Sequence, residues 1–438
     1  MNIFLKFKER VLNSNIIRNF LVVFFGDGLS SVLTILNLSI MIRVLGLNGS
    51  SIVNLVIAYI LVFDTIFNFQ SFNSIIKFLP LAMIKNDLNK VKSYIKQGFI
   101  LDLSTALISF LFSNLFLSLA GNLFNWNNEI LNLIQIYSFS ILFNLTGTSI
   151  GIIRVYNKFK YSSYINVFVN CLKFIFYLLS FVINLGMWYF IFVELVFNLI
   201  SSILLISVTM IIILKNNLRG IFKTKLVWDK EFLKFNFYCN FMTTLDVPIS
   251  HLTPFLINKF IGIEFISVYK VIEKIGGIVA KVATPLLNII YPEISKKVSE
   301  NKEMEAVSLV KRIFLFIISF GSLIVLFLFT TYKLWINILI PNGSRYAFNV
   351  LFYVVFVILK FSFVGVYPLF ISLGHIKHNI YIIIIANLIY LGVIPFLSTN
   401  LNINGVIISQ CIQVFIVISM QIFIIKRGFY KRVSFIED

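Results

Sequence analysis

The sequence predicts an all-α integral membrane protein with about twelve transmembrane helices, in two pseudo-symmetric six-helix bundles around a central cavity. Of its 438 residues, 59% are hydrophobic and only 13% are charged, and the mean hydropathy is +0.94. An ordinary soluble domain is about 25% charged. Apolar runs of about 20 residues recur, which suits a hydrocarbon layer ~30 Å thick, whereas a membrane barrel would show short alternating strands. A soluble globular domain is therefore excluded.

A weak internal repeat predicts the two bundles. The segment "RVLGLNGSSIVNL" (residues 43–55) resembles "KFIGIEFISVYKV" (259–271), and each leads to an Asn and a Pro, in "NSIIKFLP" (73–80) and "NIIYP" (288–292). An even number of predicted helices separates the copies, so the halves are parallel, an arrangement typical of transporters. We predict an N-terminal bundle over 1–215, a cytoplasmic linker over 216–235 and a C-terminal bundle over 236–438.

The first bundle contains six predicted spans. They cover residues 17–43, 50–72, 99–120, 129–152, 164–184 and 188–214. The first follows the basic residues Lys6, Lys8 and Arg10 and has no clear small-residue cleavage site, which predicts an uncleaved helix. The others are apolar runs long enough to cross a bilayer.

The second bundle also contains six predicted spans. They cover residues 236–258, 264–290, 313–338, 347–373, 379–398 and 404–425. The seventh span of the chain is unusually polar, and Pro248 and Pro254 are expected to kink it. The last two follow from an uncharged run, Asn379–Ile425, which is too long for one helix and which the turn "STNLNING" divides.

The charge distribution predicts the orientation. The net charge is +19, and most of the lysines and arginines fall in alternate loops. Basic loops face the cytoplasm and anionic lipid head groups, so both termini are predicted to be cytoplasmic. This distribution makes membrane lipids the expected partner and not nucleic acid.

Three lysines share one face of the predicted eighth span. At 100° per residue, Lys274 lies about 40° from Lys270, and Lys281 lies about 20° from it, with Glu273 on the flank. A charge in hydrocarbon costs a few kcal/mol, so this stripe must face protein or water. The pattern predicts a wet, cationic cavity, and Lys270, Lys274 and Lys281 are its candidate substrate-binding residues.

Other charges fall within predicted spans. The basic ones, Arg43, Lys173 and Lys360, join the candidate substrate-binding set. The acids could pair with lysines or bind a coupling proton or sodium ion, and both alternatives stay open; they are Asp27, Asp64, Glu194, Asp246 and Glu273. A diphosphate suits several basic groups at once. An amphiphile could place such a head group in the cavity and keep its tail in the bilayer.

The sequence lacks the short signatures of common enzymes and metal sites. The sequence contains no nucleotide-binding loop, zinc signature or nucleophile elbow. Cys171, Cys239 and Cys411 lie in apolar stretches without metal-ligand spacing. His375 and His378 stand in a short loop with no third ligand nearby. We therefore predict neither an enzyme nor a metal or other cofactor, apart from the coupling ion left open above.

Several short motifs resemble a known family. They are "RVLG" (43–46), "FNSIIKFLP" (72–80), Asp246, "IGIEFISVYKV" (261–271) and Pro292, in that order. The chain thereby resembles, over nearly its whole length, the Wzx-type O-antigen or capsule flippases of the multidrug/oligosaccharidyl-lipid/polysaccharide exporter superfamily. Where related cavities carry mostly arginines, this sequence carries lysines.

The resemblance implies a function. It implies a non-enzymatic transporter of the bacterial inner membrane that moves undecaprenyl-diphosphate-linked oligosaccharide, an O-antigen or capsule repeat unit, by alternating access. It implies an ion gradient as driving force and leaves the polysaccharide polymerase machinery as a further partner. Carried over to this chain, it makes Arg43, Lys270, Lys274 and Lys281 contacts for the head group.

Other functions remain as alternatives. A cation-coupled multidrug exporter of the same superfamily would have a cavity dominated by acids and aromatics, whereas lysines here at least match the acids. A peptidoglycan-precursor flippase would be a longer chain with extra helices. A membrane-bound glycosyltransferase or polymerase would need a large periplasmic loop, and the outward loops here are short.

Overall fold

The computed structural model describes residues 15–183 and 185–434, and these are helical without a β-strand. Within them, eight helical segments are long and apolar enough to cross a membrane. Val23–Ile84 and Ile376–Arg427 each contain two of the predicted spans. The predicted seventh span, 236–258, is divided among three short helices, and the eighth, 264–290, lies on one long helix that carries several charges. The all-α membrane fold is therefore confirmed, and twelve spans are consistent with it. Lys6, Lys8 and Arg10 lie outside the described residues.

The chain divides into two compact units, Met1–Val247 and Pro248–Asp438. The division falls later than the predicted linker at 216–235, because α11 (Lys230–Thr244) packs with the first unit. Its Phe232 is fully buried and stacks on Tyr94, with 5.4 Å between ring centroids, and lies against Phe78 at 5.7 Å. This aromatic cluster attaches α11 to the first unit.

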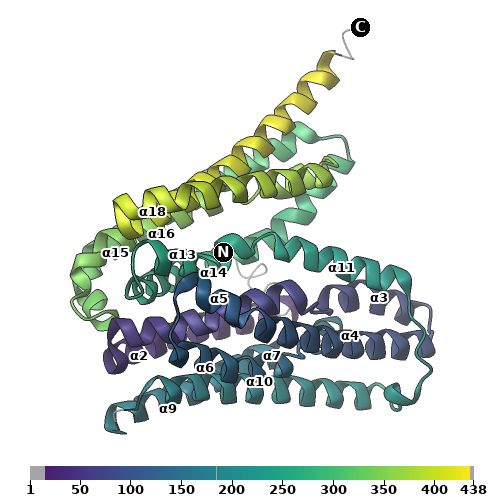
Figure 1. The fold of residues 1–438 in the computed structure, drawn as a ribbon. Helices are drawn as coiled ribbons and strands as arrows, with labels where there is room; N and C mark the ends of the chain where they lie inside the picture. The colour runs from purple at the N-terminus through teal and green to yellow at the C-terminus, as the bar shows by residue number, and fades with distance from the viewer. Residues whose placement is uncertain (1–14, 184, 435–438) are drawn as a thin grey trace, which may run out of the picture. The chain divides into compact units, whose positions relative to one another are not determined.

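The first unit is built from long helices with short connections (Figure 1). Its elements before α11 are α2 (Asn15–Phe67), α3 (Phe72–Ile84), α4 (Leu88–Leu115), α5 (Leu117–Phe124), α6 (Asn128–Tyr137), α7 (Phe139–Phe143), α8 (Gly147–Val155), α9 (Phe159–Ile183), α10 (Met187–Lys215) and the 3-10 turn η1 (Ile221–Lys223). Helix α2 packs on α9 and α4, and α3 packs on α4 and α8. Gly46, with φ 69° and ψ 179°, divides α2 into the first two predicted spans, because glycine adopts positive φ without steric cost.

Two predicted spans of the first unit are interrupted. The second stops at Phe67 and resumes as α3, and the fourth is divided among α6, α7 and α8. Polar residues fill both interruptions, including Asn68 and Ser71 in one and Asn144 in the other. Such side chains form local hydrogen bonds that compete with the helix. Non-helical backbone at membrane depth is tolerated only where it is buried in protein or lines a cavity. A functional site is therefore expected at these two interruptions.

The second unit begins at Pro248, inside α12 (Val247–Ser250). It contains α13 (Thr253–Phe260), α14 (Phe265–Ser299), α15 (Glu303–Leu339), the 3-10 turn η2 (Gly343–Tyr346), α16 (Ala347–Ser362), α17 (Val366–Ser372) and α18 (Ile376–Ser434). Helix α14 packs on α15, α16 and α17. The final helix bends at Asn402, whose φ is 50°, so the turn predicted inside the uncharged run is present.

Candidate functional site

One buried carboxylate joins the two interrupted spans. Asp102, on α4, is 1% exposed. It accepts the backbone N–H of Ser71, the residue before α3, at 3.0 Å, and that of Thr148, in the first turn of α8, at 2.7 Å. The first N–H groups of a helix have no partner within the helix and carry partial positive charge. Asp102 therefore caps both half-helices at once.

The two half-helices approach backbone to backbone. A Cβ added at Gly147 would lie 2.6 Å from the Ser71 nitrogen, closer than real Cβ contacts allow. Beside this contact, the Ser71 and Thr148 hydroxyls are 2.6 Å apart and share a hydrogen bond. Only glycine fits at position 147, and the close approach that it allows brings both helix starts within reach of Asp102.

A second carboxylate, Asp64, lies in the last turn of α2 and is 7% exposed. Its oxygens accept the side-chain amides of Asn68 at 2.8 Å and Asn144 at 2.7 Å. The Asn68 amide also donates to the Asn144 carbonyl at 3.2 Å, and because both of its partners are acceptors, its orientation is determined. Both partners of Asp64 are neutral, so its negative charge is hydrogen-bonded without being neutralised.

Asp64 borders a cavity of about 180 Å³ within the first unit. Most of its lining residues are polar. They come from α2, the interruption after it, α3 and α11: Asp64, Thr65, Asn68, Gln70, Phe72, Asn73, Cys239, Asn240 and Thr243. Asn240 donates to the Ile66 carbonyl at 2.8 Å, which satisfies one of the last carbonyls of α2. An intramembrane carboxylate beside a polar cavity can bind and release a cation. Within the described residues, no group of three or more His, Cys, Asp and Glu has the arrangement of a metal site.

Lys173 and Glu194 form an ion pair between α9 and α10. The Lys173 Nζ donates to the Glu194 carboxylate at 2.6 Å, and the Tyr177 hydroxyl donates to its other oxygen, also at 2.6 Å. The side chains of the pair are 17% and 19% exposed. This half-buried lysine and glutamate satisfy each other and join the two helices without an uncompensated charge.

Replacing one partner of this ion pair is expected to lower the stability of the protein more than replacing both partners. Lys173→Met alone leaves Glu194 largely buried without its cation and should lower the free energy of unfolding by about 3–5 kcal/mol. The double variant Lys173→Met, Glu194→Leu should recover most of that loss, since no uncompensated charge remains. Unfolding of both variants in detergent checks this. A double variant less stable than Lys173→Met would contradict the interpretation.

The lysine face of α14 is present on a continuous helix. Lys270 forms an ion pair with Glu273, one turn away, at 2.6 Å, with side chains 16% and 31% exposed. Lys274 is half-buried and Lys281 is exposed. Lys270 is therefore next to an acid of its own helix, and all three lysines stay on the face that the spacing predicts, because α14 is unbroken from Phe265 to Ser299.

The remaining predicted site residues are dispersed. Arg43, Asp246 and Lys360 are exposed, on α2, before α12 and near the end of α16 respectively, and Asp27 is half-buried on α2. Sequence reasoning missed Asp102, although an aspartate inside the apolar run "FILDLSTALISF" was the signal that could have found it. It also missed Asn68 and Asn144, because their importance comes from their contact with Asp64.

These features define a class of protein: a multi-pass helical membrane protein with interrupted helices and charged groups inside its bundles. A comparison with known families matches residues 16–298 to the polysaccharide biosynthesis protein family. The chain belongs to that family. A search of curated proteins found no significant match.

Solved structures show the same fold. A multidrug resistance MATE family transporter of the MOP superfamily, inward-facing, has a TM-score of 0.68 over 92% of this chain and 95% of its own, at 14% identity. The lipid II flippase MurJ, inward closed, has a TM-score of 0.65 over 94% and 87%, at 17% identity. A MOP superfamily transporter from Pyrococcus furiosus has a TM-score of 0.61 over 93% and 95%, at 14% identity. The protein therefore has the fold of MOP superfamily transporters.

Proposed function

We propose that the protein is a flippase of the bacterial inner membrane, with both termini in the cytoplasm. It moves undecaprenyl-diphosphate-linked oligosaccharide, an O-antigen or capsule repeat unit, from the inner to the outer leaflet by alternating access. The observation that carries this proposal is the lysine face of α14 in a chain of the polysaccharide biosynthesis family. A lipid-linked sugar of this kind presents a diphosphate, and several ammonium groups at helical spacing suit its charge.

Asp64 is the proposed coupling group. Its carboxylate has only neutral amide partners and borders a polar cavity, so a proton or sodium ion can change the charge of the first unit there. Asp102 has a different role in this proposal, because its two oxygens are committed to the starts of α3 and α8.

A cation-coupled multidrug exporter is the second candidate, favoured by the likeness to MATE transporters. The two functions differ in what they carry. An exporter would extrude cationic dyes from proteoliposomes, whereas the flippase would move a labelled lipid-linked sugar between leaflets. The lysines on α14 favour the flippase, since like charges repel a cationic drug.

Replacing Lys274 with alanine tests the head-group contact. We expect translocation of the lipid-linked sugar to fall by about 10- to 100-fold, the effect of losing a charged hydrogen bond to the diphosphate. Insertion into the membrane should be unchanged, and Lys274→Arg should retain much of the activity. Lys296→Ala is the matched control, since Lys296 lies on the same helix with its side chain 75% exposed. Wild-type translocation by Lys274→Ala would count against the proposal.

A further inference from the structure

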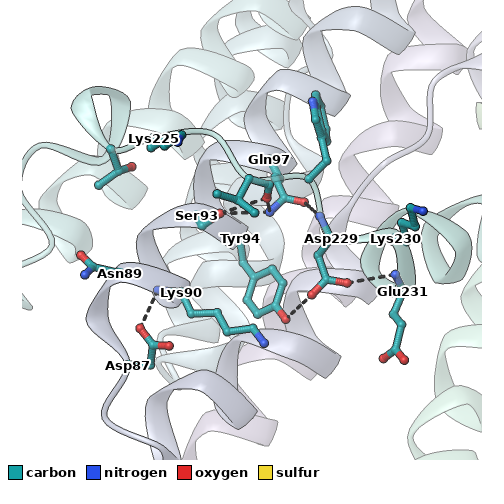
Figure 2. Close-up of a pocket in the computed structure, with 13 residues that line it drawn as sticks. Asp87, Asn89, Lys90, Ser93, Tyr94, Gln97, Lys225, Asp229, Lys230 and Glu231 are labelled. Atoms are coloured by element: carbon teal, nitrogen blue, oxygen red, sulfur yellow. Dashed lines mark hydrogen bonds between the residues drawn. The ribbon is translucent and has the colours of Figure 1, made fainter.

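The first unit contains a second, larger cavity, of about 800 Å³ (Figure 2). It lies between the start of α4, the segment that precedes α11 and the first residues of α11, and it shares no lining residue with the cavity at Asp64. The proposed topology places it on the cytoplasmic face. Its volume is within the range of small-molecule sites, about 300–1,000 Å³.

One wall of this cavity is held by specific hydrogen bonds. Gln97, on α4, donates to the Val227 carbonyl at 2.6 Å and accepts the Asp229 N–H at 2.9 Å. The neighbouring Lys96 donates to the carbonyls of Phe222 and Thr224 at 3.0 and 2.7 Å. The segment before α11 is therefore fixed along α4, and the cavity has a defined shape.

Asp229 completes the wall. Figure 2 shows its carboxylate between Tyr94, whose hydroxyl donates to it at 2.9 Å, and the start of α11, where it accepts the Glu231 N–H at 2.9 Å. Burial alone would raise the pKa of Asp229, but the hydrogen bonds from two backbone N–H groups and from Tyr94 outweigh it, so the pKa lies below its usual value. The residue therefore stays ionised at neutral pH.

Other side chains that line the cavity take no part in these hydrogen bonds. The side chains of Asn89, Lys225, Lys230 and Glu231 make no hydrogen bond or ion pair to another described residue. Trp228 is 47% exposed, although a buried indole would be favoured. The structure thus presents amide, ammonium and carboxylate groups and an aromatic face to whatever enters.

The charges of the lining restrict the ligand. Lys90, Lys225 and Lys230 are balanced by the three acids of the lining, Asp87, Asp229 and Glu231. The carboxylates would repel a free diphosphate, and the ammonium groups would repel a cation. An apolar ligand would remove water from both kinds of charged group without offering them hydrogen bonds. A neutral polyhydroxylated ligand fits, because its hydroxyls donate to carboxylates and accept from ammonium groups. Its C–H face can cover Trp228.

We propose that this cavity binds the saccharide part of the cargo before translocation. The proposal rests on the proposed function and deepens it, since it assigns a site within the first unit to the sugar of the lipid-linked cargo. Trp228 supplies the aromatic face, and Asn89, Lys225 and Glu231 supply hydrogen bonds to sugar hydroxyls. The cavity thereby selects among glycans that share one lipid carrier.

The test is calorimetric binding to the purified full-length protein, in a detergent without a sugar head group. The probe is the oligosaccharide released by mild acid from the lipid-linked pool of cells that express the protein. Trp228→Ala and Glu231→Gln should each weaken binding at least about ten-fold, through lost contact with the sugar. Trp188→Ala is the matched control, since Trp188 is 42% exposed at the start of α10 and outside the cavity.

The outcomes separate this inference from the proposed function. Equal binding of the oligosaccharide by wild type, Trp228→Ala and Glu231→Gln would overturn the saccharide site. Binding of inorganic diphosphate or of phosphatidylethanolamine vesicles that depends on Trp228 would also overturn it. Translocation of the same lipid-linked pool by wild-type proteoliposomes is measured in parallel. If the wild type binds the oligosaccharide but does not translocate the pool, the proposed function fails and the saccharide site stands.

Discussion

Replacing Asp102 with alanine should lower the free energy of unfolding by about 2–6 kcal/mol, because two buried backbone N–H groups would lose their acceptor at about 1–3 kcal/mol each. These groups belong to Ser71 and Thr148, both of which are fully buried, so water cannot easily replace the carboxylate. The starts of α3 and α8 would lose their shared cap. Denaturant unfolding in detergent measures the effect.

Two variants serve as controls for Asp102. Asp87→Ala removes another carboxylate that caps a helix, since Asp87 accepts the Lys90 N–H at 2.9 Å at the exposed start of α4. Its loss should be only about 0.5–2 kcal/mol. Asp102→Asn keeps one carbonyl acceptor and should fall between wild type and alanine. If Asp102→Ala were as stable as Asp87→Ala, the double cap would not be important for stability.

Replacing Asp64 with asparagine is expected to abolish the response of transport to an ion gradient, a loss on the order of ten-fold or more. Asparagine cannot change its charge in the cycle. Asn68 and Asn144 donate to different oxygens of Asp64, so an asparagine amide keeps an acceptor at only one of the two positions and places a donor at the other. Translocation in proteoliposomes with an imposed pH or sodium gradient measures the effect, and the gradient that drives the wild type identifies the ion.

Thr243→Ala is the control for Asp64. Thr243 lines the same cavity but carries no charge, so this variant should keep the response to the gradient. Unfolding of Asp64→Asn has to be measured in parallel, since one unsatisfied amide would cost about 1–3 kcal/mol of stability. An Asp64→Asn variant that still responds fully to the gradient would exclude Asp64 as the coupling group.

Two ion pairs between predicted charges, both among the described residues, differ in how far sequence could predict them. Lys270 and Glu273 are three residues apart on one helix, and that spacing alone puts them side by side. Lys173 and Glu194 lie on different helices, 21 residues apart, so sequence could name both as candidates without joining them. Their contact depends on how α9 packs on α10.

The sequence by itself determined that this protein is a helical membrane protein and that α14 carries lysines on one face. The length of an apolar run and the spacing of residues on a helix are set by neighbouring residues, and the free energy of transfer into hydrocarbon is a sum over each run. Only the tertiary structure decided that Asp102 caps two separate half-helices and that Asp64 lies between Asn68 and Asn144. Those hydrogen bonds join residues up to 80 positions apart, and they form only where packing brings separate helices within about 3 Å.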